Sequence, residues 1–167
     1  MLIFDLNGTL VKRFYKPNGA RTEYDHEYDN FYVVIRPYLR ELTDFLHTNG
    51  MEYMFWTNAL AHNAKCITQI LIKEGMQPVA WLHRQHCSFI DNICKKDLSV
   101  VGAMHNINLE EIYLIEDMAT RSVQGQNVIL VENFGGDKAD NALLKLIDDL
   151  KEIRGKGRKE MKMADKK

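Results

Sequence analysis

Short apolar runs that alternate with segments of helical spacing are the feature of this chain that most limits its fold. The apolar runs predict strands at residues 2–6, 31–35, 51–56, 79–82, 112–115 and 128–131. Helices are expected at residues 37–48, 59–74 and 140–153, with a short helix or turn at 98–102. Such runs are typical of strands buried on both faces. We therefore expect an α/β fold, in which a parallel sheet is flanked by helices on both sides.

Three segments fall outside this alternation. Residues 12–30 are polar and aromatic with a turn signal at Pro17-Asn18-Gly19, and their aromatic residues favour hairpin packing. Residues 83–95 are polar and are expected to be irregular. Residues 155–167 are Lys-rich, contain two glycines and are expected to fray. The predicted organisation is therefore one domain at residues 1–154, followed by a flexible tail.

Polar residues directly follow three of the expected core strands. They are Asp5, Thr57 and the pair Glu116-Asp117, and Lys96 lies in a loop region between two of those strands. Ligands of parallel α/β sheets bind at the carboxyl ends of the strands, so these side chains are expected to meet at one edge. Carboxylates hold Mg²⁺, while a lysine and a hydroxyl hold a phosphoryl group. The combination predicts phosphoryl transfer through an aspartyl-phosphate.

Composition excludes several other classes of protein. The 22 Lys and Arg residues against 23 Asp and Glu give a formal net charge of -1, which argues against direct bulk binding of nucleic acid. Three cysteines, none in a C-x-x-C pair, argue against a disulfide framework or a structural zinc site and are typical of a reducing compartment. We see neither a signal peptide nor an apolar run long enough to span a membrane. An intracellular location, nuclear or cytoplasmic, is the resulting expectation.

Six sequence segments together resemble a known family. They are F-D-L-N-G-T-L at residues 4–10, Y-V-V-I-R-P at 32–37, F-W-T-N-A-L-A at 55–61, H-R-Q-H-C at 83–87, K-D-L-S at 96–99 and Y-L-I-E-D at 113–117. The first is one residue away from the D-x-D-x-T-L/V signature of haloacid-dehalogenase-type (HAD) phosphatases. The others, in the same order and with similar spacing, resemble the FCP/SCP branch, the RNA polymerase II C-terminal-domain phosphatases or NLI-interacting-factor-like group. This resemblance covers roughly residues 2–153.

The resemblance implies a HAD-like, Rossmann-like sheet with a small β insertion after its first strand and no large cap domain. It also implies catalytic roles. Asp5 becomes the nucleophile that takes the phosphoryl group, Thr57 donates a hydrogen bond to the phosphate, and Lys96 neutralises it and orients the nucleophile. Asp117 and Asp5 are implied as Mg²⁺ ligands, with Glu116 supporting the metal shell.

Further residues are implied as phosphate or substrate contacts: Gly8, Thr9, Asn58, Arg84, Tyr15 and Leu60. Gly8 and Thr9 shape a turn whose backbone N–H groups are expected to cradle phosphate oxygens. Tyr15 and Leu60 match positions that line an apolar substrate groove in the family. Without the resemblance, Thr57 would be interpreted as the N-cap of the helix at 59–74, and Arg84 equally well as a surface charge.

Asn7 departs from the family pattern, which has a second Asp at this position as general acid and base. The backbone carbonyl of Asn7 can still serve as a metal ligand, but an amide gives up no proton near neutral pH. Loss of general acid–base catalysis typically slows a reaction by about 10²–10⁴-fold. Both a naturally weakened phosphatase and an engineered trap of an active enzyme are compatible with Asn7.

Three functions follow from these residues. The first is a Mg²⁺-dependent protein Ser/Thr phosphatase acting on a phosphorylated protein or peptide, such as the RNA polymerase II C-terminal repeat. The second is a catalytically dead pseudophosphatase that binds phosphopeptides or acts as a scaffold. The third is a HAD phosphatase that acts on nucleic-acid ends or small phosphate esters.

Overall fold

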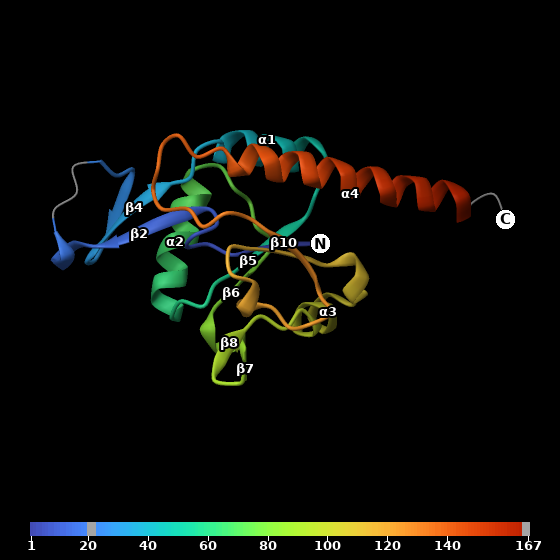
Figure 1. Cartoon of the computed structure of the whole chain (residues 1–167), viewed down its shortest axis with the longest axis horizontal. Coiled ribbons are helices and arrows are strands. Elements are labelled where there is room, and N and C mark those ends of the chain that lie inside the picture. The colour runs from blue at the N-terminus through green and yellow to red at the C-terminus, as the bar shows by residue number, and fades with distance from the viewer. Residues whose placement is uncertain (20–22, 165–167) are drawn as a thin grey trace.

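A parallel five-stranded sheet forms the centre of the molecule (Figure 1). The computed structural model describes residues 1–19 and 23–164. The strand order is β10-β9-β1-β5-β6, with bounds Asn127–Leu130, Tyr113–Glu116, Leu2–Phe4, Tyr53–Trp56 and Trp81–Leu82. Each neighbouring pair is parallel. The predicted α/β sheet is confirmed, and β1 lies between the two strands that carry the other polar residues.

Alternate residues of the strands pack into two different cores, which explains why the runs are apolar throughout. Leu2 and Phe4 of β1 contribute to a core that also holds side chains of α1, α2 and α4. Ile3 points to the opposite core, which includes Val101 of α3. The bounds of these helices are Leu39–Thr48 for α1, Ala61–Lys73 for α2, Ser99–His105 for α3 and Ala142–Ala164 for α4. The sheet is therefore covered on both faces, as predicted (Figure 1).

The described helices differ from the expected ranges mainly at their ends. α1 begins at Leu39 rather than at residue 37, because Tyr38 adopts a left-handed φ of 65° as the N-cap. α4 continues to Ala164, well beyond the expected end at residue 153. Residues 165–167 of the predicted flexible tail lie outside the described residues, and the domain boundary at 154 stays a prediction. None of the described helices is long and apolar enough to cross a bilayer.

A three-stranded antiparallel sheet is inserted between β1 and α1. Its order is β2-β4-β3, with bounds Val11–Tyr15, Phe31–Ile35 and His26–Tyr28. Two contacts join this sheet to α2. The ring of His26 on β3 lies 2.5 Å from the carboxylate of Glu74, which caps α2. The ring of His62 on α2 lies 2.6 Å from the carboxylate of Asp29, just after β3. The small β insertion implied by the resemblance is thus present and attached to the main domain.

Residues 83–95 are not irregular, and this expectation was wrong. They contain the 3₁₀ turn Arg84–His86 and a hairpin of β7, Ser88–Ile90, and β8, Ile93–Lys95. The two turn residues, Asp91 and Asn92, have φ values of 52° and 62°. Positive φ at both central residues matches the twist of a two-residue hairpin, and Asp and Asn tolerate it better than most residues.

Arg36 is a buried arginine that connects the loop after β1 to the C-terminal third of the chain. Its Nε and NH2 groups donate to the two carboxylate oxygens of Asp140, both at 2.8 Å. NH2 also donates to the Glu132 carbonyl at 2.6 Å, and NH1 to the Thr9 carbonyl at 3.0 Å. The guanidinium is fully buried, so each of these acceptors replaces water that it has lost.

We predict that Asp140→Asn lowers the free energy of unfolding by about 2–3 kcal/mol, because it leaves a buried arginine without its counter-ion. Hydrogen bonds from Arg36 outweigh burial and lower the pKa of Asp140. Its contribution is therefore complete above the unfolded carboxyl pKa of about 3.9 and is lost as pH falls through the folded value. Denaturant titrations at a series of pH values measure this, with the exposed Asp148→Asn as control, for which less than about 0.5 kcal/mol is expected.

Candidate active site

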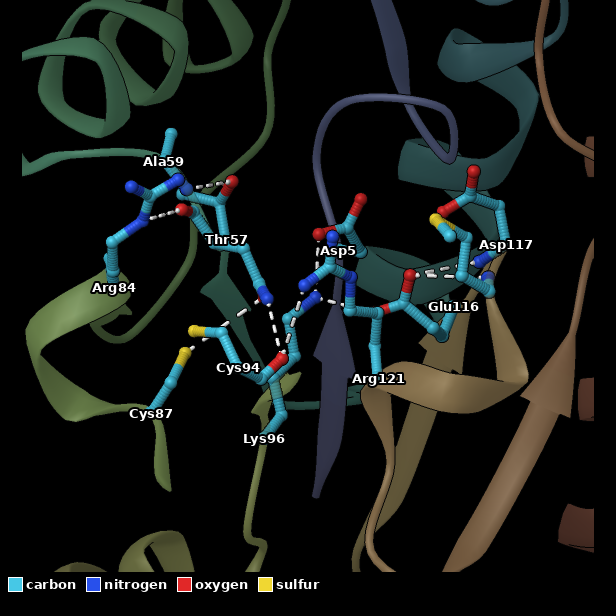
Figure 2. Close-up of polar contacts among 12 residues, drawn as sticks. Asp5, Thr57, Ala59, Arg84, Cys87, Cys94, Lys96, Glu116, Asp117 and Arg121 are labelled. Carbon is cyan, nitrogen blue, oxygen red and sulfur yellow. Dashed lines mark hydrogen bonds and ion pairs between the residues drawn. The ribbon is translucent and has the colours of Figure 1, made fainter. Parts of the chain in front are cut away.

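The carboxyl ends of three neighbouring strands bring the predicted polar residues to one place. Asp5 follows β1, Thr57 follows β5, and Glu116 ends β9 with Asp117 directly after it. Asp5, Thr57 and Glu116 are almost completely buried, while Asp117 is half-buried. Figure 2 shows these side chains converging on the position expected from strand order alone.

Lys96 completes this group from the segment after the β7–β8 hairpin. Its backbone N–H donates to the Arg121 carbonyl at 2.7 Å, which fixes the segment against the loop that follows β9. Its Nζ donates to Asp5 Oδ1 at 2.5 Å and to Glu116 Oε2 at 2.6 Å. The ammonium group is fully buried, so these two carboxylates replace its hydration.

Burial shifts the protonation of all three groups. It raises the pKa of Asp5, an effect that Lys96 partly offsets. Burial and then the negative charge of Asp5 raise the pKa of Glu116 to about 8. For Lys96 burial acts in the other direction, but attraction from the two carboxylates outweighs it and raises the pKa of the ammonium. Lys96 therefore stays charged at neutral pH, and the acidic cluster favours a proton or a cation.

The acidic cluster has the composition of a hard-cation site. Carboxylate oxygens of Asp5, Glu116 and Asp117 lie within 4.8 Å of one another. An all-oxygen donor set of this kind suits Mg²⁺, which binds few protein ligands and keeps several waters. The Asn133 amide donates to Asp117 Oδ2 and holds that carboxylate in place.

Gly8 is required by the close approach of Asp117. Its φ is 101°, and a Cβ at this position would overlap Asp117 Oδ2 and lie 2.8 Å from Asn133 Nδ2. Its N–H donates to the Val11 carbonyl at 2.8 Å, so it is not available to a phosphate oxygen here. Gly8 thus shapes the turn, and the phosphate contact expected of it stays a prediction.

An open pocket of about 210 Å³ lies above the cluster. Seven of the predicted site residues line it: Asp5, Asn7, Thr57, Asn58, Arg84, Glu116 and Asp117. Lys96 does not line the pocket but contacts two residues that do, Asp5 and Glu116. A phosphate group and the atoms next to it fit into such a volume. The pocket is open, so a larger substrate can also reach it.

Five predicted residues are not among those that line the pocket: Gly8, Thr9, Tyr15, Leu60 and Lys96. Thr9 is fully buried, and its Oγ1 has no hydrogen-bond partner among the described residues. Tyr15 and Leu60 are 44% and 57% exposed, and the Tyr15 ring packs against Phe31. The apolar groove assigned to these two residues stays a prediction.

Asn7 uses its side chain to hold the insertion. Its Oδ1 accepts the backbone N–H of Arg13 at 2.9 Å, and Asn7 forms an isolated bridge with Val11. A carboxylate oxygen accepts the same hydrogen bond as an amide oxygen. The turn therefore does not require an amide at this position.

Thr57, Asn58 and Arg84 form a connected set beside the pocket. Thr57 Oγ1 accepts the Ala59 N–H at 3.2 Å, but the N-cap of α2 is Leu60, so Thr57 is not the helix cap that its sequence position indicated. Arg84 Nε donates to the Asn58 carbonyl at 2.7 Å. Asn58 Nδ2 donates to the Cys94 carbonyl at 2.8 Å, which ties the β5–α2 loop to the hairpin.

Sequence reasoning missed four residues that shape the site: Arg13, Arg36, Arg121 and Asn133. Arg13 and Arg121 line the pocket, and Asn133 contacts Asp117. Arg13, Arg121 and Asn133 do not directly follow an expected apolar strand, which was the signal used to find candidates. Arg36 lies within the Y-V-V-I-R-P segment, but its role depends on Asp140, which is distant in the chain.

The sheet order, the inserted β sheet and the carboxylate–lysine group define a HAD-like phosphatase domain of the FCP/SCP type. The profile of the NLI interacting factor-like phosphatase family matches residues 1–161. The chain therefore belongs to this family.

Individual relatives agree with this assignment. Mouse and human carboxy-terminal domain RNA polymerase II polypeptide A small phosphatase 2 are each 31% identical to it over 162 residues. The match covers 92% of this chain and 57% of each relative, so the chain spans little more than half of their length. The fission yeast RNA polymerase II CTD phosphatase Fcp1 bound to beryllium fluoride shares the fold, with a TM-score of 0.57 at 16% identity over 89% of this chain and 48% of that one.

We predict that Lys96→Met destabilises the protein by about 3 kcal/mol, because it leaves Asp5 and Glu116 buried without their cation. The matched control is Lys95→Met, because Lys95 is the preceding residue, at the end of β8, and forms no ion pair with the described residues. Urea titration at pH 7 compares the two variants. Equal and small losses for both would show that the Lys96 ion pairs contribute little to stability.

Proposed function

We propose that this chain hydrolyses phosphoserine or phosphothreonine in a protein, through an aspartyl-phosphate on Asp5. The observation that carries the proposal is the Asp5 carboxylate at the end of β1, oriented by Lys96 at 2.5 Å and facing the pocket. Names of the relatives support a phosphorylated polypeptide such as the C-terminal repeat of RNA polymerase II. The openness of the pocket supports a macromolecular substrate. A nuclear or cytoplasmic location stays part of this proposal.

In the first step an oxygen of Asp5 attacks the phosphorus and the bond to the serine oxygen breaks. Negative charge on the phosphoryl oxygens is stabilised by Lys96, by the Thr57 hydroxyl and by the Arg84 guanidinium. Asp5, Asp117, Glu116 and the backbone carbonyl of residue 7 would hold Mg²⁺. When bound, this ion supplies further positive charge next to the transferred group.

In the second step water attacks the phosphorus of the acyl-phosphate and releases inorganic phosphate and Asp5. In both steps a proton must move: to the serine oxygen first, and from the water next. The Asn7 amide does neither near pH 7. Serine is a poorer leaving group than a phenol with a pKa of about 10, so phosphoserine turnover is expected to suffer more than that of an aryl phosphate.

The first test is hydrolysis of an aryl phosphate and of phosphopeptides, with Mg²⁺ and with excess EDTA. We expect hydrolysis that requires Mg²⁺ and that Asp5→Asn abolishes, together with covalent labelling of Asp5. Lys95→Met is expected to keep the wild-type rate. Activity that survives in Asp5→Asn would contradict the assignment of the nucleophile.

The second test is Asn7→Asp, which restores a group that can exchange a proton. We expect a gain of about 10²–10⁴-fold in Mg²⁺-dependent turnover, greater for phosphoserine than for an aryl phosphate. The wild-type chain is expected to accumulate phosphorylated Asp5 on mixing with aryl phosphate, visible by mass spectrometry. A wild-type rate equal to that of Asn7→Asp, without a trapped species, would refute the role given to position 7.

Asn7 also favours a second candidate, a non-catalytic phosphopeptide-binding protein that retains the pocket. On this alternative Asn7→Asp gains no turnover, while phosphopeptides still bind and the Arg84→Gln variant binds them more weakly. The two candidates thus differ in one measurement, the rate of the Asn7→Asp variant.

A further inference from the structure

Two arginines lie where the catalytic pocket meets a second hollow. Arg84 comes from the 3₁₀ turn before β7, and Arg121 from the 3₁₀ turn Ala119–Arg121 after β9 (Figure 2). Both line the catalytic pocket, and both also line an adjoining hollow of about 470 Å³. Met118 is shared by the two hollows in the same way. The pocket therefore continues past these residues toward the β7–β8 hairpin.

Neither guanidinium is neutralised by a carboxylate within 4.0 Å in the part of the chain that the structure describes. Arg84 Nε donates to the neutral carbonyl of Asn58, and Arg121 NH1 to that of Cys94 at 3.3 Å. Arg84 is exposed and Arg121 is half-buried. A guanidinium presents five N–H donors in a planar fork, so each arginine has further donors besides the one that binds a carbonyl here.

Negative charge is confined to one of the two hollows. The catalytic pocket is lined by the three carboxylates of the acidic cluster together with Arg13 and the two shared arginines, whereas the second hollow has the shared arginines and no acidic residue among its described lining. Its remaining surface combines the neutral polar side chains of Asn92 and Thr120 with apolar ones, including Phe89, which is 71% exposed. The arginines of this hollow suit an anionic group, and its apolar side chains suit the chain to which that group is attached.

We propose that the second hollow is a subsite for a second phosphate on the substrate. Arg121 holds this phosphate, and Arg84, which lines both hollows, lies between it and the phosphate at Asp5. The preferred substrate is then a doubly phosphorylated peptide, with one phosphate at Asp5 and the other on the hairpin side. This inference rests on the proposed function, because it defines the substrate class of the same site.

A peptide agrees better with this surface than a nucleic acid does. The chain has a formal net charge of -1, which provides little of the diffuse positive potential that holds a polynucleotide. The two arginines form one compact site, which suits one additional phosphate rather than a continuous backbone. Ile93 and Met118 offer aliphatic contact for the side chains of a peptide between or beyond the two phosphates.

The experiment measures the binding and hydrolysis of fluorescent peptides by the whole chain in Mg²⁺ buffer. Each peptide carries one phosphoserine, and a second one is placed one to four residues before or after it. We expect a second phosphate to increase both affinity and kcat/KM about 10-fold at a restricted spacing, and on one side only. Arg121→Gln is expected to reduce this ratio to about 1, and Arg121→Lys to retain part of it.

Arg121 also contacts the Cys94 carbonyl, so every result is expressed as a ratio to the singly phosphorylated peptide on the same variant. The control is Arg40→Gln, which removes the same charge from the exposed surface of α1, where the side chain is 90% exposed. This variant is expected to keep the full preference.

Several outcomes would overturn the subsite. They are equal binding of singly and doubly phosphorylated peptides, a preference that persists in Arg121→Gln, and tighter Arg121-dependent binding of a 5′-phosphorylated oligonucleotide. If the preference is seen in binding but no peptide is hydrolysed, the subsite stands and the proposed catalytic function fails. If peptides are hydrolysed but show no preference for a second phosphate, the proposed catalytic function stands and the subsite fails.

Discussion

The ammonium group of Lys96 between the carboxylates of Asp5 and Glu116 is the interaction on which the site depends. Three ionisable groups that are almost free of solvent would be costly to bury individually, and the hydrogen bonds among them offset that cost. The contact also joins three distant segments of chain: β1, the segment after the hairpin, and β9. The same two hydrogen bonds of Lys96 therefore stabilise the fold and orient the Asp5 carboxylate.

The sheet and most of the pocket were predictable because they depend on local pattern. An apolar run closed by Asp5 or Thr57 indicates both a buried strand and the edge at which its polar residue lies. The β7–β8 hairpin was missed, because the turn Asp91-Asn92 lacks the glycine that usually marks such turns. Contacts of Arg121 depend on how distant loops meet, and no spacing along the chain reveals them.

Asn7 separates the architecture of the site from its proton chemistry. Its side-chain oxygen accepts the Arg13 N–H, a task that Asp performs equally well, so the insertion is anchored whichever residue is present. The family fold, the acidic cluster and the pocket are accordingly all retained beside an amide. Exchange at this position changes the chemistry that is available while leaving the surrounding contacts in place.

Arg36 couples the turn after β1 to a distant part of the chain. The guanidinium binds carbonyls of the turn at residues 8 and 9, but its counter-ion is Asp140, more than a hundred positions later. The turn beside the nucleophile is therefore held by a contact with a distant loop. A substitution near Asp140 alters the pocket through Arg36, although Asp140 itself does not line that pocket.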